Sequence, residues 1–199
     1  MNRTVDYYFA PQSPWTYLGH SRLREILRQR GAQVRVMPVD LGGKVFPNSG
    51  GLPVGQRAPQ RQAYRLVELE RFSQYLSAPL NLKPKYFPVA GDDASRLIIA
   101  VDQLWGVHAA MDITGAILAA CWAQERNIAD PAVLAELVSE HKLDPACLDK
   151  ANSQSVQEAY ERYTERAIAA GVFGAPSYVV DSEIFWGQDR LDFLDRRLA

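Results

Sequence analysis

The chain has only two cysteines among its 199 residues, Cys121 and Cys147, and they lie far apart. It therefore contains no Cys-x-x-Cys motif, so the thiol pair that performs disulfide exchange is missing. The three histidines, His20, His108 and His141, do not combine with these cysteines in the spacing of a zinc site. We expect two core cysteines rather than a disulfide, and no metal site.

A strong charge bias and long apolar runs are also absent. The 22 basic and 23 acidic residues leave a formal net charge of −1, which gives no reason to expect nucleic acid or an acidic membrane as a partner. No stretch approaches 18 consecutive apolar residues, and the first nine residues resemble a strand rather than the core of a signal peptide. The sequence therefore predicts an ordinary globular protein with a cytoplasmic location.

A short motif, Ser13-Pro14-Trp15-Thr16, stands between a strand-like and a helix-like segment. Residues 4–9 have the composition of a strand. Residues 14–30 have helical apolar spacing, with Pro14 suited to the first helical position and Gly31 to the end. A second strand is expected over 33–39, so residues 4–39 predict a parallel β-α-β unit.

The middle of the chain has a different character. Residues 40–58 are rich in glycine and surround Asn48, which predicts a long loop. From 59 to about 170 the pattern is helical almost throughout, and Gly171 ends the last helix. Expected helix starts lie at Pro59, Asp92–Asp93, Asp130–Pro131, Asp144–Pro145 and a capping box at Ser155-x-x-Glu158.

The C-terminal segment returns to strands. Residues 177–181 and 183–186 predict a hairpin that turns at Asp181–Ser182, where glycine would suit the second position better, so we expect a slightly strained or longer turn. Gly187-Gln188-Asp189 then begins a final amphipathic helix. The predicted class is α/β, a thioredoxin-like fold (β-α-β then β-β-α) interrupted by a large all-helical insertion. Its thioredoxin-like domain comprises 1–58 and 171–199, and the insertion domain 59–170.

Ser13 has a plain structural explanation, because serine before a helix is a good N-cap worth about 1 kcal/mol. A thioredoxin-like oxidoreductase, however, has Cys-x-x-Cys at this place and a cis-proline before its terminal hairpin. Here Gly174-Ala175-Pro176-Ser177 occupies the second place, while both sulfurs of the first are replaced. A site of this shape without its own thiol suggests a borrowed one, and glutathione is the obvious donor.

Five motifs, spread over essentially the whole chain, resemble the 2-hydroxychromene-2-carboxylate isomerases. That family is related to the kappa-class glutathione transferases and belongs to the DsbA-like thioredoxin superfamily. The motifs are Ser13-Pro14-Trp15, Leu41-Gly42-Gly43, Pro59-x-Arg61-x-x-Tyr64, Phe173-Gly174-Ala175-Pro176, and Phe185-Trp186-Gly187-Gln188-Asp189-Arg190-Leu191, the last being the most specific.

The resemblance implies a glutathione site. Ser13 would hydrogen-bond the glutathione sulfur and favour its thiolate, since a free thiol has a pKa near 8.5. Ala175, before the expected cis-proline Pro176, would pair through its backbone with the extended tripeptide. Gln188 and Asp189 would hold the γ-glutamyl end, although Asp189 could equally act as an N-cap.

Further residues have weaker support from the resemblance. Asn48 and Arg61 would lie near glutathione, but their spacing is longer than in the kappa class and arginine replaces the common lysine. Arg61 could hold the glycyl carboxylate or be a solvated helix charge. Trp15 and Trp186 could wall a flat substrate, or belong to the core, and Lys44 is a candidate for the substrate carboxylate.

The activity implied by the resemblance is the glutathione-dependent interconversion of 2-hydroxychromene-2-carboxylate, a small aromatic carboxylate, and trans-o-hydroxybenzylidenepyruvate. Reversible addition of a thiolate to the enone would allow rotation about its double bond and regenerate glutathione. The family also implies a homodimer. A kappa-type glutathione transferase and a non-catalytic glutathione-binding module remain alternatives, whereas Ser13 and Thr16 cannot form the disulfide of an oxidoreductase.

Overall fold

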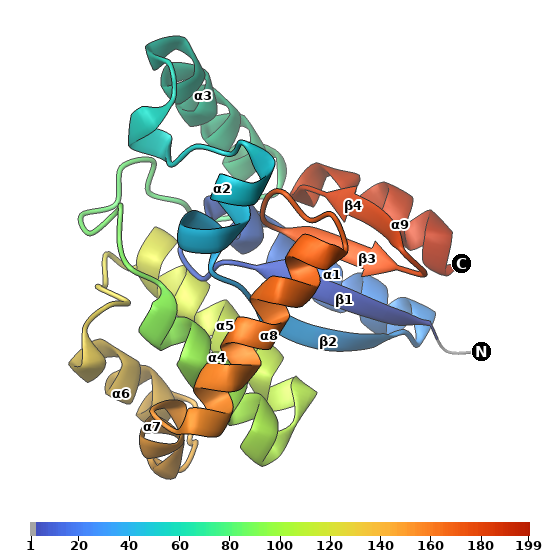
Figure 1. The fold of residues 1–199 in the computed structure, drawn as a ribbon. Coiled ribbons are helices and arrows are strands. Elements are labelled where there is room, and N and C mark those ends of the chain that lie inside the picture. Colours follow the sequence, from blue (N-terminus) through green and yellow to red (C-terminus); the bar gives the residue numbers. More distant parts are fainter. Residues whose placement is uncertain (1–2) are drawn as a thin grey trace.

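The computed structural model describes residues 3–199, and a four-stranded sheet lies within them (Figure 1). Its strands are β1 (Thr4–Phe9), β2 (Gln33–Pro38), β3 (Ser177–Val180) and β4 (Glu183–Trp186), in the spatial order β2-β1-β3-β4. β1 pairs in parallel with β2 and antiparallel with β3, and β4 pairs antiparallel with β3. This topology confirms the predicted thioredoxin-like fold.

Helices connect and cover these strands. α1 (Pro14–Arg30) links β1 to β2, and α9 (Leu191–Leu198) ends the chain after the 3₁₀ turn η3 (Gln188–Arg190). The insertion between β2 and β3 contains the helices α3 (Pro59–Tyr75), α4 (Asp92–Trp105), α5 (Val107–Trp122), α6 (Pro131–Glu140), α7 (Ala146–Ala151) and α8 (Gln154–Ala169).

The local sequence explains the bounds of α1. Ser13 adopts extended backbone and its side chain accepts a hydrogen bond from the Thr16 amide, while Pro14 takes the first helical position. Gly31 ends the helix in the left-handed conformation (φ 61°), and its amide donates to the carbonyl of Leu27. The helix therefore starts within the Ser13-Pro14-Trp15-Thr16 motif.

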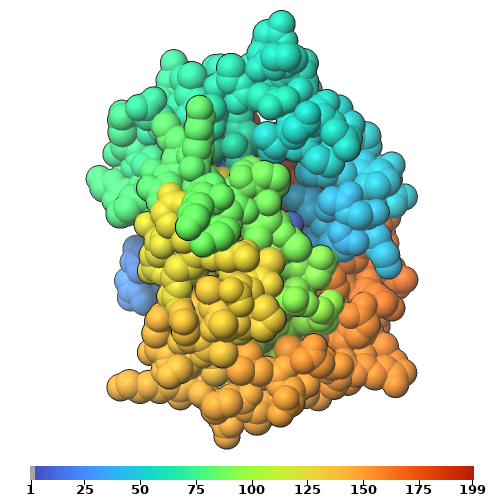
Figure 2. All heavy atoms as spheres, turned by 90° about the vertical axis from the view of Figure 1, so that its left-hand side faces the viewer, coloured from blue at the N-terminus to red at the C-terminus, as the bar shows by residue number. Residues whose placement is uncertain are grey.

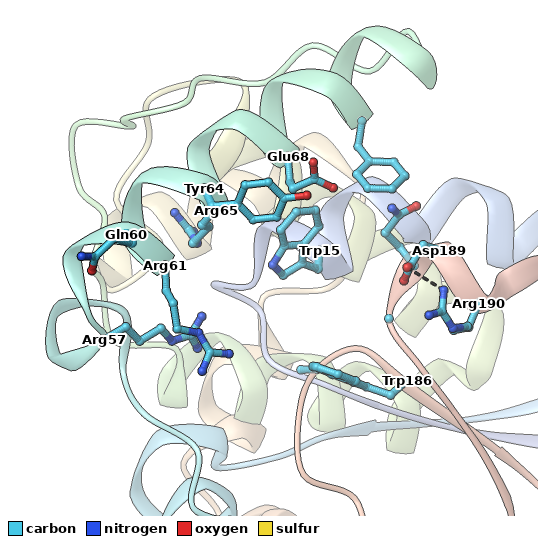
Figure 3. Close-up of a pocket in the computed structure, with 14 residues that line it drawn as sticks. Trp15, Arg57, Gln60, Arg61, Tyr64, Arg65, Glu68, Trp186, Asp189 and Arg190 are labelled. Carbon is cyan, nitrogen blue, oxygen red and sulfur yellow. Dashed lines mark hydrogen bonds and ion pairs between the residues drawn. The ribbon is translucent and has the colours of Figure 1, made fainter.

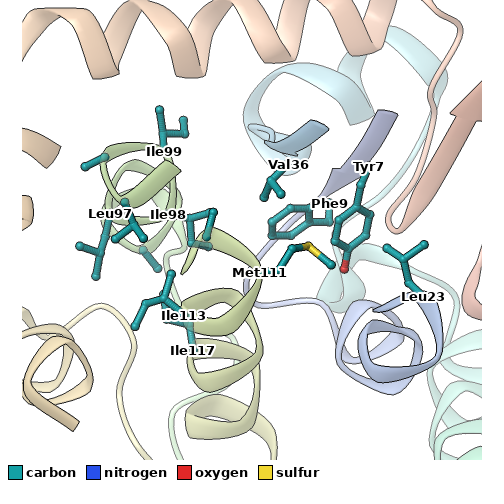
Figure 4. Close-up of a cluster of buried hydrophobic side chains, with 14 of the residues drawn as sticks. Tyr7, Phe9, Leu23, Val36, Leu97, Ile98, Ile99, Met111, Ile113 and Ile117 are labelled. Atoms are coloured by element: carbon teal, nitrogen blue, oxygen red, sulfur yellow. The ribbon is translucent and has the colours of Figure 1, made fainter. Parts of the chain in front are cut away.

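The side chains of β1 alternate between two cores. Val5, Tyr7 and Phe9 face the main core, which also contains apolar residues of α1, α4, α5 and α9 (Figure 4). Tyr8 faces the opposite side, where it packs in a smaller cluster with Ala167 of α8. The helical insertion thus shares its core with the sheet, and α8 crosses the face of the sheet opposite α1 (Figure 1).

The predicted loop over 40–58 was wrong in detail. This segment contains the π-helical turn η1 (Leu41–Val45), the short helix α2 (Phe46–Ser49) and the 3₁₀ turn η2 (Val54–Gln56). The Asp40 carboxylate accepts a hydrogen bond from the Gly43 amide at 2.7 Å, and Gly50 ends α2 with φ 72°. Asp40 and Gly50 of this segment therefore serve as helix caps.

Two helix starts also differ from expectation. Gly91 precedes α4, so Asp92 and Asp93 lie in its first turn, where carboxylates interact favourably with the helix dipole. The N-cap of α8 is Ser153, which replaces the capping box expected at Ser155.

The hairpin turn has two residues, Asp181 (φ 49°) and Ser182 (φ 69°), both in the left-handed conformation that suits a two-residue hairpin.

Within residues 3–199, both cysteines are buried and free, and no helix is long and apolar enough to cross a membrane.

Candidate functional site

Two adjoining cavities lie where the N-terminus of α1, the loop before β3 and helix α3 meet. Their volumes are about 580 Å³ and about 1300 Å³. They share the lining residues Trp15, Arg57, Arg61, Arg65, Ala175 and Trp186, so they form one continuous groove. Figure 2 shows this side of the molecule, hollowed between the cyan residues near 45–60 and the green residues near 80–90.

Ser13 is the point at which the two sequence motifs meet. Its side chain is 8% exposed, and its Oγ accepts from the Thr16 amide at 3.2 Å and donates to the Ala175 carbonyl at 3.4 Å. The Ala175–Pro176 bond is cis, as expected. The hydroxyl at the start of α1 therefore faces backbone that lies 162 residues further along the chain.

The loop around the cis bond is fixed by its own hydrogen bonds. The Ser177 hydroxyl donates to the Gly174 carbonyl at 2.8 Å, and the Gly187 amide donates to the Pro176 carbonyl at 2.9 Å. A Cβ at Gly174 would collide with the indole of Trp186, so glycine is required there for Trp186 to lie over the loop. Pro176 itself is buried behind the groove.

Two tryptophans wall the groove from different sides (Figure 3). Trp15, on the first turn of α1, makes an edge-on contact with Phe72 of α3, with ring centroids 6.0 Å apart. Trp186, at the end of β4, is 51% exposed and packs against Phe173 with centroids 4.7 Å apart. Both rings leave a face or an edge available to a flat ligand.

Gln188 adds a buried polar group to the lining of the smaller cavity. Gln188 is 1% exposed, and in the described part of the chain neither its side-chain amide oxygen nor its amide nitrogen has a hydrogen-bond partner. Buried amides are rarely left unpaired, so this side chain is suited to a polar ligand. Beside it, the Asp189 carboxylate pairs with Arg190 at 2.7 Å and lines the same cavity (Figure 3).

Three arginines line both cavities and make the groove electropositive. Arg61 and Arg65 lie one turn apart on α3, and Arg57 precedes that helix and donates from its Nε to the Leu52 carbonyl at 2.8 Å. Across residues 3–199, none of the three lies within salt-bridge distance of a carboxylate. Burial, and then Arg61, lower the pKa of Arg57; burial, and then Arg57, lower that of Arg65 to about 10.

The structure brings most of the predicted site residues together. Ser13, Trp15, Arg61, Ala175, Trp186, Gln188 and Asp189 all line the groove. Lys44 and Asn48 line neither cavity; both are exposed, and the Asn48 amide donates to the Lys44 carbonyl at 2.9 Å. The structure therefore does not bring Lys44 and Asn48 into the lining of the groove.

Sequence reasoning missed Arg57 and Arg65. The signal was present, because Arg57, Arg61 and Arg65 recur every four residues and so favour one side of a helix. A run of arginines on a charged helix is nevertheless most often a solvated face, and only the packing of α3 over the groove distinguishes the two cases.

The described part of the chain holds no cluster of three metal-ligating side chains. Burial raises the pKa of the Cys121 thiol to about 12, so that thiol stays protonated and unreactive at neutral pH. The site therefore contains a hydroxyl, arginines and an amide, but no reactive sulfur of its own.

Comparison with known proteins places these features in context. The DsbA-like thioredoxin domain family matches residues 4–199. The 2-hydroxychromene-2-carboxylate isomerase of Sphingobium xenophagum is 28% identical over 200 residues, covering 100% of this chain and 99% of that protein. The enzyme of the same name from Pseudomonas putida is 30% identical over 218 residues, covering 98% and 94%. A solved structure of a 2-hydroxychromene-2-carboxylate isomerase superposes with a TM-score of 0.79 at 23% identity, covering 98% of this chain and 94% of that one.

Proposed function

The chain belongs to the DsbA-like thioredoxin family and, within it, to the 2-hydroxychromene-2-carboxylate isomerases, and on this premise we propose a glutathione-dependent isomerase. Its reaction would interconvert 2-hydroxychromene-2-carboxylate and trans-o-hydroxybenzylidenepyruvate, as in the breakdown of naphthalene-type aromatics. The observation that carries the proposal is the Ser13 hydroxyl, placed at a helix N-terminus and 3.4 Å from the carbonyl of the cis-proline loop.

The residues present fit glutathione. The unpartnered amide of Gln188 and the carboxylate of Asp189 suit the γ-glutamyl end, with its ammonium and carboxylate groups. The backbone of Ala175 suits an extended peptide, and Arg61 suits a carboxylate. Bound glutathione would supply a thiolate whose reversible addition to the β-carbon of the enone allows rotation about the former double bond.

The residues of the chain would support this chemistry without a redox step. The Ser13 hydroxyl can rotate from the Ala175 carbonyl toward a sulfur and donate to its anionic form, and the N-terminus of α1 favours the same charge. Trp15 and Trp186 would hold a flat substrate and keep water from it. The cysteines, buried and distant in sequence from the motif, would take no part.

The test is turnover of 2-hydroxychromene-2-carboxylate, followed by absorbance with and without a catalytic amount of glutathione, with free thiol measured at the end. We expect isomerisation that requires glutathione and leaves its amount unchanged. Conversion that proceeds equally without glutathione would contradict the proposal. Loss of glutathione to an electrophile such as a chloronitroarene, without isomerisation, would instead indicate the transferase activity of the kappa class.

A further inference from the structure

Within residues 3–199, no carboxylate lies within salt-bridge distance of the Arg65 guanidinium group. Arg65 is 9% exposed, and one terminal nitrogen of its guanidinium group is buried without a hydrogen-bond partner among the residues that the structure describes. The guanidinium lies 5.1 Å from the ring centre of Phe87 and 5.7 Å from that of Trp122, so cation–π contacts fix its position. The guanidinium group also lines both cavities, so a positive charge that is left without a counter-charge there indicates an anionic partner from outside the chain.

The acidic side chains of the groove are already paired elsewhere. Glu68, one turn after Arg65 on α3, pairs with Arg71 at 2.7 Å, and Asp189 pairs with Arg190. The charged residue that shifts the pKa of Arg65, after burial, is Arg57, which carries a like charge. The surroundings of Arg65 therefore select an anion, and a planar guanidinium is best matched by a carboxylate bound through two parallel hydrogen bonds.

The walls beside Arg65 indicate what the anion is attached to. The larger cavity is lined by both Ser13 and Arg65, and its lining also includes these apolar residues: Leu66, Leu82, Pro84, Phe87, Pro88 and Val89. Such a surface suits a flat aromatic body that ends in one negatively charged group. Lys44, the residue expected from the sequence to bind this group, lies outside the cavity.

From these observations we propose that Arg65 binds the carboxylate of an aromatic oxo-acid substrate and thereby selects that substrate class. The inference rests on the proposed function, since it assigns the end of the substrate remote from the glutathione thiol. Arg61 also lines both cavities but is more exposed than Arg65, and in this proposal it binds the glycyl carboxylate of glutathione.

Two matched probes test the proposal by binding alone. trans-Benzylidenepyruvate and benzylideneacetone share the phenyl enone, but the second has a methyl group in place of the carboxylate. Isothermal titration would give Kd for each probe, and for glutathione, with the unmodified chain and with Arg65→Met, which keeps the length and packing of the side chain. We expect Arg65→Met to weaken benzylidenepyruvate binding by about ten- to a hundredfold, with benzylideneacetone and glutathione unchanged.

Arg162→Met is the matched control, because Arg162 is an exposed arginine on α8 that lies outside both cavities and pairs with no residue of the groove, and we expect no change with either probe. Arg65→Lys keeps the positive charge but loses the planar guanidinium group, so this variant should bind benzylidenepyruvate with intermediate affinity. If Arg65→Met does not fold, the same measurements are made with Arg65→Lys.

An equal loss for both probes would overturn the proposal in favour of a packing role. A loss confined to glutathione would overturn it in favour of the glycyl carboxylate. Since neither result depends on turnover, the inference and the isomerase activity can fail separately.

Discussion

Ser13 combines a structural role with the proposed catalytic one, and substitution can separate them. Ser13→Ala should cost about 1 kcal/mol of unfolding free energy because α1 loses its N-cap, whereas Ser13→Gly should cost only about a few tenths. Both variants lose the hydroxyl, so both should lower kcat/KM about ten- to a hundredfold. Urea unfolding and glutathione-dependent turnover would measure the two effects.

Ser13→Thr retains both the hydroxyl and the cap and serves as the control for this pair. It should keep stability and most of the activity. If kcat/KM instead ranked the three variants in the same order as their free energies of unfolding, with Ser13→Gly more active than Ser13→Ala, Ser13 would be only an N-cap.

His20 makes stability depend on pH. Its Nδ1 lies 3.3 Å from the Tyr7 hydroxyl and its Nε2 lies 2.9 Å from the Met111 carbonyl, an arrangement that suits a neutral ring with its proton on Nε2. Burial lowers the pKa of His20 to about 4, below the ordinary value of 6.5, and the Met111 hydrogen bond only partly opposes this.

The unfolded chain consequently binds more protons than the folded one between these two pKa values. The contribution of His20 to the free energy of unfolding should be constant above pH 6.5. It should fall by up to about 3 kcal/mol as the pH drops toward 4. Urea unfolding at pH 7.5, 5.5 and 4.5 would show a weaker pH dependence for His20→Gln than for the natural chain. Parallel curves for the two proteins would contradict this assignment.

At the level of elements, the site depends on how closely η3 approaches α1. A Cβ at Gly19 would lie 2.8 Å from the Cβ of Gln188 and 2.8 Å from the Tyr178 hydroxyl oxygen. Glycine in a helix interior costs about 1 kcal/mol relative to alanine, so its presence here is explained by this contact. The contact positions the unpartnered amide of Gln188 in the groove.

Gly19→Ala should therefore destabilise the protein by about 1–3 kcal/mol through overpacking, despite the gain in helix propensity. It should also weaken glutathione binding, because Gln188 is displaced. Ser21→Ala, an exposed change on the same helix, is the control and should alter neither quantity. Thermal unfolding and glutathione titration would measure both, and an unchanged glutathione affinity would argue against a role for Gln188.

At the level of the whole molecule, the main core does not divide along the predicted domain boundaries. Tyr7 and Phe9 of the sheet belong to one cluster with Ile98 of α4 and Ile113 of α5, so the insertion covers apolar surface of the sheet (Figure 4). Neither part can bury that surface alone.

We therefore expect the 1–58/171–199 part and the 59–170 part to unfold together in a single transition. Native-state hydrogen exchange should give similar opening free energies for the central amides of β1 and of α4 and α5. A lower opening free energy confined to the insertion would show that it unfolds as a separate unit.

Local physical chemistry explains which features the sequence predicts well. Apolar periodicity, proline at helix starts and glycine at helix ends depend on near neighbours, so α1, β1, β2 and the terminal hairpin lie close to their predicted bounds. The same local signals place Ser13 at a helix start and Pro176 before a strand. The sequence by itself thus determined the fold class and the two segments that meet in the site.

Only the tertiary structure decided which charged and polar groups enter that site. Arg65 packs over Phe87 and Trp122, which lie outside α3, while Lys44 and Asn48 are exposed and line neither cavity. Gln188 is buried because Gly19, on a helix far earlier in the chain, leaves room for it. These orientations depend on packing between distant segments, and no pattern within a single segment carries that information.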